Sequence, residues 1–371
     1  MKPKGSRPKS VPRKRSLQVK QRPGSASSSS SLWVRHKKLF RWLIGIAVVI
    51  IALAIAVMVW FRVSPWPNSM LIRYAFNKDG TKTAKALEKY VPSGIVEVSS
   101  QQYRAGDKDA YLDVFYPLGT VEPRPTVVWV HGGAWVSGNK DQIDNYLKIL
   151  ASHGYTTVGV NYSIAPEHKY PTPLHQVNDA LAYLQQNAKR LNIDDTRIVM
   201  AGDSAGSQIV AQIANIITSP DYAREIGISP KLEASKLVGL LLNCGAYDLS
   251  LPDYNGPFGG FLKTVLWAYS GKKDFLNDPV LEHASVVNYV TPNFPPSFIT
   301  AGNDDPLEEQ STEFAKKLQS LGVPVVTRFY PKNHEPKLGH EYQFSLDLED
   351  SKQALDQMVQ FLNERIAKSD L

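Results

Sequence analysis

One serine in this 371-residue chain stands where a nucleophile would be held. The pentapeptide Gly-Asp-Ser-Ala-Gly at 202–206 follows the apolar run 198–201 and precedes a helical pattern, which predicts a sharp strand-to-helix turn at Ser204. Strand and helix nearly touch at such a turn, so the positions two residues away must lack side chains, as Gly202 and Gly206 do. The motif alone is weak evidence, so the prediction depends on what accompanies it.

A nucleophilic serine needs a general base and a group that orients that base. Two carboxylates, Asp304 and Asp305, follow the apolar run 297–301, and two histidines, His334 and His340, follow the next apolar run. Serine, acid and histidine in this chain order are the arrangement expected of an α/β-hydrolase. From order alone, either carboxylate and either histidine could complete a triad.

A glycine pair gives the third sign of acyl chemistry. The segment His-Gly-Gly-Ala-Trp at 131–135 follows the apolar run 126–130, and glycines there let backbone N–H groups turn toward a substrate oxygen. Together with the N–H of Ala205, just after the serine, the N–H groups of Gly133 and Ala134 would form an oxyanion hole. An ordinary glycine turn is the plainer interpretation, but the position ahead of the serine motif argues against it.

These blocks resemble the α/β-hydrolase esterases of the hormone-sensitive-lipase-like branch, which includes bacterial carboxylesterases, over about residues 95–367. Four blocks carry the resemblance, at 131–135, 161–168, 202–206 and 295–307. It implies a Ser-His-Asp mechanism without metal or cofactor. It selects Asp305, directly before Pro-Leu, as the acid, and it selects His340, in a Gly-His-Glu-Tyr turn, over His334.

The chain also departs from the family pattern. Ala134 and Trp135 stand where many lipase-like members have a third glycine and an aromatic or aliphatic residue, a variant that resembles carbohydrate-ester and formamide hydrolases. A long insertion at about 244–290 is rich in aromatic residues, namely Tyr247, Tyr254, Phe258, Phe261, Trp267, Tyr269 and Phe275. Family likeness predicts a lid or an acyl-pocket wall there, whereas simple packing against the body is an equal alternative.

Strand and helix patterns alternate after residue 95, which predicts an α/β domain over 95–371. Two runs with period-two alternation, 95–103 and 111–116, are typical of antiparallel edge strands. Continuous apolar runs then alternate with helical patterns, which predicts a mostly parallel central sheet with helices on both faces. The apolar runs are 126–130, 156–160, 197–201, 238–242, 297–301 and 324–330, and the helical patterns are 141–153, 173–191, 205–219, 308–321 and 346–367.

The N-terminal part is basic and then apolar. Residues 1–41 hold thirteen Lys or Arg and no acidic residue, which leaves 29 basic against 35 acidic residues elsewhere. We interpret 1–38 as a disordered cytoplasmic tail, not a nucleic-acid arm, because the uncharged run from Leu43 to Phe61 can cross a bilayer core of about 30 Å. The basic flank favours a cytoplasmic N-terminus, and the absence of a small-x-small cleavage site favours an uncleaved transmembrane helix, 39–62, over a signal peptide.

Two smaller features complete the organisation. Residues 63–94 are predicted to be a linker with a short amphipathic helix near Ala84 to Tyr90, stopped by Pro92. The single cysteine, Cys244, cannot form a disulfide within one chain and is interpreted as core filler.

The sequence therefore predicts a membrane-anchored serine esterase that faces the extracytoplasmic side. It would cleave a small ester through an acyl-enzyme, with Ser204, His340 and Asp305 as triad. The same mechanism on amide, formamide or acetylated carbohydrate substrates is one alternative. A surface binding protein that keeps the fold without its chemistry is another. Neither the natural substrate nor the oligomeric state follows from the sequence.

Overall fold

A computed structural model describes residues 29–119 and 122–369, and the chain divides into two compact units, Met1–Trp60 and Phe61–Leu371. Helix α1 (Ser29–Val63) contains the stretch Arg35–Val63, which is long and apolar enough to cross a membrane, and an 18-residue window within it has a mean hydropathy of 3.0. No proline or glycine interrupts the chain between Ser29 and Leu43, so the last part of the predicted tail, 29–38, is helical. The rest of that prediction, for residues 1–28, lies outside the described residues.

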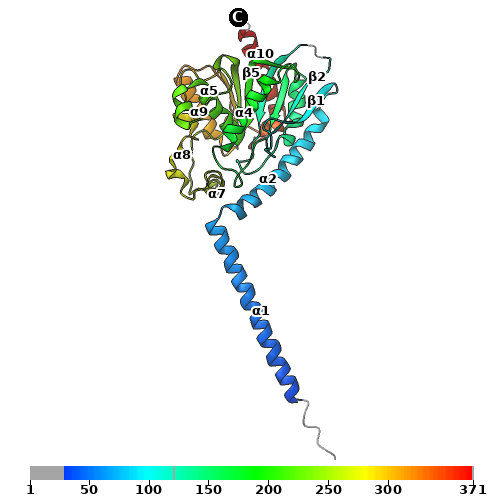
Figure 1. The fold of residues 1–371 in the computed structure, drawn as a ribbon, viewed down its shortest axis with the longest axis vertical. Coiled ribbons are helices and arrows are strands. Elements are labelled where there is room, and N and C mark those ends of the chain that lie inside the picture. The colour runs from blue at the N-terminus through cyan, green and yellow to red at the C-terminus, as the bar shows by residue number, and fades with distance from the viewer. Residues whose placement is uncertain (1–28, 120–121, 370–371) are drawn as a thin grey trace, which may run out of the picture. The chain divides into compact units, whose positions relative to one another are not determined.

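The second unit alternates strands and helices, as the sequence predicts (Figure 1). Its strands are β1 (Ile95–Gln102), β2 (Tyr111–Pro117), β3 (Arg124–Val130), β4 (Thr156–Val160), β5 (Ile193–Asp203), β6 (Leu237–Asn243), β7 (Ser297–Thr300) and β8 (Val325–Arg328). Its α-helices are α2 (Trp66–Leu87), α3 (Asp144–Ala151), α4 (Thr172–Gln186), α5 (Ala205–Thr218), α6 (Pro220–Ile226), α7 (Gly259–Ser270), α8 (Pro279–Glu282), α9 (Glu308–Ser320) and α10 (Glu349–Ser369). Short 3-10 turns are η1 (Glu88–Tyr90), η2 (Lys140–Gln142), η3 (Ala234–Lys236), η4 (Phe275–Asn277), η5 (Val286–Asn288) and η6 (Tyr342–Phe344).

The strands form one eight-stranded sheet in the order β1-β2-β4-β3-β5-β6-β7-β8. Strand β2 pairs antiparallel with both β1 and β4, and the remaining pairs are parallel, which confirms the predicted mostly parallel sheet with antiparallel edge strands. Strands β3 and β5 are neighbours, so the loop that follows β3 and the turn that follows β5 emerge side by side at the carboxyl edge. This edge is where α/β sheets carry their sites.

Helices cover both faces of the sheet, which confirms the predicted layers. Leu181 of α4, Ile209 of α5 and Phe314 of α9 belong to one buried cluster. Leu150 of α3 and Phe361 of α10 belong to a second cluster on the opposite face. Nearly every side chain of α5 is buried, which fixes the helix that begins directly after Ser204.

Helix α2 is much longer than the short helix predicted for the linker. It begins at Trp66, with Pro67 in its first turn where a missing N–H costs nothing, and runs to Leu87. It contacts α7, and the two lie at the same end of the body in Figure 1. Helix α2 also contacts η2, and Gly80 allows a close approach at that point, since a Cβ at this position would lie 2.7 Å from Oε1 of Gln142.

Candidate active site

Ser204 lies at the turn between β5 and α5 with φ 50° and ψ −119°, a backbone conformation that is rare for a residue with a side chain. A Cβ added to Gly202 would lie 2.6 Å from the carbonyl carbon of Gly206, and one added to Gly206 would lie 2.0 Å from the carbonyl oxygen of Val130. Both contacts are too close for any side chain. The glycines therefore hold the serine at a tight turn between two closely packed elements.

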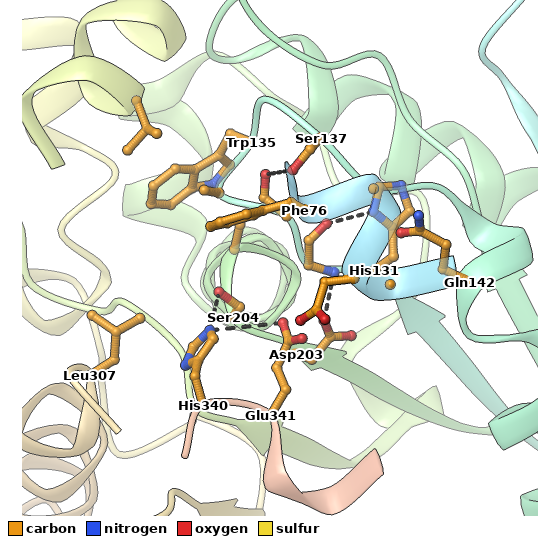
Figure 2. Close-up of a pocket in the computed structure, with 18 of the residues that line it drawn as sticks. Phe76, His131, Trp135, Ser137, Gln142, Asp203, Ser204, Leu307, His340 and Glu341 are labelled. Carbon is orange, nitrogen blue, oxygen red and sulfur yellow. Dashed lines mark hydrogen bonds and ion pairs between the residues drawn. The ribbon is translucent and has the colours of Figure 1, made fainter. Parts of the chain in front are cut away.

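Ser204, His340 and Asp305 form one hydrogen-bonded row, although they come from distant parts of the sequence. The Nε2 atom of His340 lies 2.9 Å from Oγ of Ser204, and its Nδ1 lies 2.9 Å and 3.0 Å from the two carboxylate oxygens of Asp305. With the ring proton on Nδ1, the imidazole donates to Asp305 and accepts the serine hydroxyl proton. Figure 2 shows the imidazole turned toward Ser204.

The other sequence candidates lie elsewhere. Asp304 is exposed, and its backbone N–H donates to the carbonyl of Leu338 at 2.9 Å. The imidazole of His334 lies 3.2 Å from the carboxylate of Asp350 instead of near the serine. Asp305, in contrast, has a fully buried side chain.

The loop after β3 is held in an open conformation beside the serine. Gly133 has φ 112°, and a Cβ there would lie 2.3 Å from the carbonyl oxygen of Ser137. The carbonyl of Gly133 is occupied, because the Ser137 hydroxyl donates to it at 2.7 Å. Among the described residues, no group accepts a hydrogen bond from the N–H of Gly133 or Ala134, and the N–H of Ala205 lies in the first turn of α5, where a helix provides no partner. These three N–H groups are available to a ligand.

The pKa of His340 is raised well above its ordinary value of 6.5. Burial disfavours the charged ring, whereas the charge of the Asp305 carboxylate and its hydrogen bond with Nδ1 favour it. The imidazolium formed when His340 takes a proton is therefore stabilised where it is needed.

The family profile of BD-FAE matches residues 112–318, which is more than half of the chain. The chain belongs to the BD-FAE family. The matched part contains the loop after β3, Ser204 and Asp305, whereas His340 follows it.

Two curated proteins are similar to this chain. An alpha/beta hydrolase of Acanthamoeba polyphaga mimivirus is 28% identical over 235 residues, 62% of this chain and 65% of that protein. An acetyl esterase of Salmonella dublin is 28% identical over 231 residues, 60% of this chain and 68% of that protein. The match thus spans about two thirds of either relative's length.

The α/β-hydrolase fold is confirmed by a solved structure, inhibited esterase B from Lactobacillus rhamnosis. It superposes with a TM-score of 0.71 over 81% of this chain and 97% of that one, at 21% identity. This similarity shows the fold.

The site of this BD-FAE member opens into a cavity of about 340 Å³. Phe76 of α2 lines it together with Phe258 and Phe261 at the start of α7, and the rings of Phe76 and Phe261 are 5.6 Å apart. Figure 2 shows Phe76 lying across the pocket from His340. Aromatic residues of the insertion lie in two places, because Phe258 and Phe261 line the pocket while others, such as Tyr269, are buried in the core. A lid or an acyl-pocket wall in this insertion stays a prediction.

Asp203 has a structural role that the sequence motif did not reveal. Its Oδ1 accepts a hydrogen bond from Nε1 of Trp129, and its Oδ2 accepts one from the backbone N–H of Gly132, both at 2.7 Å. Its pKa is raised well above the ordinary value, first by burial and then by the charge of Glu341. Asp203 therefore ties the glycine loop to the strand that carries Ser204.

Sequence analysis also missed the neighbours of His340. Cys244, interpreted as core filler, is buried directly after β6, and its Sγ lies within 4.8 Å of a ring nitrogen of His340. Burial raises the pKa of its thiol to about 11, so the thiol is neutral at physiological pH. Glu341 adopts φ 58°, which aims its carboxylate into the pocket with Oε1 at 3.8 Å from Nε2 of His340.

Within the described residues, two groups of side chains have metal-ligand spacing. Cys244, Asp305 and His340 have ligand atoms within 4.8 Å of one another, but the last two are joined to each other. The second group is Asp113, Asp141 and Asp144, and there Lys140 already forms ion pairs with Asp113 at 2.5 Å and Asp141 at 2.6 Å.

Proposed function

We propose that this protein is a serine esterase that hydrolyses carboxylic esters through an acyl-enzyme. The row from Ser204 through His340 to Asp305 carries the proposal, because it joins a hydroxyl, a base and an orienting carboxylate within hydrogen-bond distance. A binding protein that had lost its chemistry would have no reason to keep this row beside unpaired N–H groups.

In the proposed first step, Oγ of Ser204 attacks the ester carbonyl carbon while Nε2 of His340 takes the hydroxyl proton. The carbonyl oxygen becomes an oxyanion, held by the N–H groups of Gly133, Ala134 and Ala205. Each such donor is worth about 3 kcal/mol in comparable sites. Asp305 stabilises the imidazolium and keeps the ring oriented.

The intermediate then collapses. The bond to the alcohol oxygen breaks, His340 returns its proton to that oxygen, and an ester of Ser204 remains. Water attacks this acyl-enzyme with His340 again as base, which releases the acid and restores the serine.

A short acyl group is the substrate feature we favour, since one relative is named an acetyl esterase. The aromatic wall of Phe76, Phe258 and Phe261 would accommodate the apolar part of the substrate.

We also propose that α1 anchors the enzyme in the cell membrane as a single span, with a cytoplasmic N-terminus and an extracytoplasmic catalytic unit. Arg35–Val63 supports this by length and apolarity, and Arg35, Lys37, Lys38 and Arg41 at its start support the orientation. Protease added to intact cells should digest the catalytic unit. Digestion only after lysis would contradict the orientation.

The deciding experiment labels the full-length protein with a fluorophosphonate and assays a panel of short acyl esters, acetylated sugars and small amides. The proposal predicts labelling at Ser204, no labelling of Ser204→Ala, and turnover of esters. Labelling without ester turnover, but with amide or acetylated-sugar turnover, would support those alternatives. Absence of both labelling and turnover would favour the binding protein.

A further inference from the structure

The pocket beside Ser204 is lined by acidic side chains. Three carboxyl groups line it, from Asp79, Asp203 and Glu341, and no Lys or Arg is among the described residues that do so. Neutral polar groups, such as that of Gln142, make up much of the remaining polar surface. With His340 in the neutral form that acts as base, a cavity lined by carboxyl groups and by no lysine or arginine carries a negative potential.

Glu341 lies beside the place of the leaving alcohol. His340 can protonate the departing oxygen only within about 3 Å of Nε2. Since Oε1 of Glu341 lies 3.8 Å from that nitrogen, the alcohol oxygen passes within about 7 Å of the carboxylate. Figure 2 shows the side chain of Glu341 next to that of His340. A charge on the alcohol would therefore interact with Glu341 more strongly than would a charge on the distal acyl chain.

Asp203 and Glu341 face different surroundings. The two carboxyl oxygens of Asp203 accept hydrogen bonds from Trp129 and Gly132, and burial, followed by the charge of Glu341, raises its pKa. The side chain of Glu341 is 34% exposed and faces the cavity, so Glu341 is the acidic group of this pair that a substrate can meet.

Asp79 adds a second carboxylate from helix α2. It is exposed, and within the described part of the chain no ion pair joins it to a cation. The positive end of α5 lies at Ser204, where it acts on the oxyanion instead of on the alcohol.

We propose that the acidic wall of Glu341 and Asp79 selects esters by the charge of their alcohol, so that esters of positively charged alcohols are preferred over neutral ones and anionic ones are rejected. This inference rests on the proposed esterase function, and it names the alcohol class for the same site. At these separations a unit charge changes kcat/KM by roughly tenfold in either direction.

Three acetate esters of similar size test the inference with the full-length enzyme. They are acetylcholine, its neutral isostere 3,3-dimethylbutyl acetate, and the acetate of 4-hydroxybutanoate. We expect kcat/KM to fall about tenfold at each step in that order, and to converge as salt is raised, because ions screen the pocket. Equal values for the three esters, or a preference for the anionic one, would overturn the inference.

The variant Glu341→Gln tests whether Glu341 causes the preference for the cationic ester. It should reduce the ratio of cationic to neutral ester toward one, with Asp79→Asn giving a smaller reduction that can be measured even if Glu341→Gln does not fold. The matched control is Glu313→Gln on α9, a half-exposed carboxylate that does not line the pocket, and it should leave the ratio unchanged. A ratio that stays unchanged in both pocket variants would contradict the assignment.

If none of the three esters is cleaved and Ser204 is not labelled, the esterase function itself fails. Cleavage of the neutral ester without charge preference defeats only this inference.

Discussion

The carboxylate of Asp203 accepts a hydrogen bond from the backbone N–H of Gly132 at 2.7 Å, so the residue before the nucleophile holds the loop of the proposed oxyanion hole. The two residues come from neighbouring strands, β5 and β3. Replacing Asp203 by Ala should lower kcat by about 10- to 100-fold with a smaller change in KM, because the loop loses its anchor and a buried N–H is left unpaired. Steady-state kinetics would measure this. Trp129→Phe removes only the second donor and should cost much less. Equal losses in the two variants would contradict an anchoring role.

The pH profile should report His340. Below its pKa the imidazole is protonated and cannot accept the serine proton, so kcat/KM should rise with pH, with a midpoint above the ordinary 6.5. Asp305→Asn removes a carboxylate that raises this pKa, so the midpoint should move to lower pH while kcat falls by about 10⁴-fold. A flat acid side in the parent enzyme would exclude His340 as base.

Gly206→Ala should destabilise the protein, because its new Cβ would lie 2.0 Å from the carbonyl oxygen of Val130. We expect a loss of about 2 kcal/mol or more, seen as a fall in Tm, together with loss of activity. Gly260→Ala on α7 is the matched control, since nothing lies within 4 Å of its added Cβ, and it should be neutral or slightly stabilising. Similar Tm values for the two variants would mean that the turn is not tightly packed.

Cys244 should be unreactive in the folded protein. Its side chain is buried and its thiol has a pKa of about 11, so iodoacetamide at pH 8 should modify it at least about 100-fold more slowly than it modifies glutathione. Mass spectrometry would follow the alkylation. Adding denaturant should restore a normal rate. Rapid modification of the native enzyme would place the thiol at an accessible surface instead.

Phe76 should set the preference for acyl length. Phe76→Ala opens the aromatic wall beside Phe261, so KM for a hexanoate ester should rise several-fold while KM for an acetate changes little. Tyr74→Ala is the control on the same helix, because Tyr74 is 72% exposed and lies outside this pocket. Parallel changes for both chain lengths would show that the wall does not contact the acyl group.

The sequence was most informative where local patterns decide the structure. Strand and helix alternation predicted the layers, because an element buried on both faces must be apolar throughout. The glycines at 202 and 206 predicted the turn at Ser204 for a similar reason, since the close approach of strand and helix leaves no other residue. The roles of Ser204, His340 and Asp305 stay predictions, now with a geometry that experiments can test.

The contacts that could not be predicted from the sequence depend on long-range packing. Cys244 reaches His340 only because β6 lies beside β7 and a later loop folds back over both. Glu341 enters the pocket through a left-handed backbone conformation that its residue type does not favour. Phe76 precedes the short helix predicted near Ala84 to Tyr90, and no local pattern shows that its helix contacts α7, about 180 residues later.

Helix α2 follows the apolar helix after two residues and also forms one wall of the cavity. Anyone who shortens the chain to obtain a water-soluble enzyme should therefore cut before Trp66. A chain that starts at β1 instead would lack Phe76 and Asp79, so the cavity would lose one wall and open to bulk water.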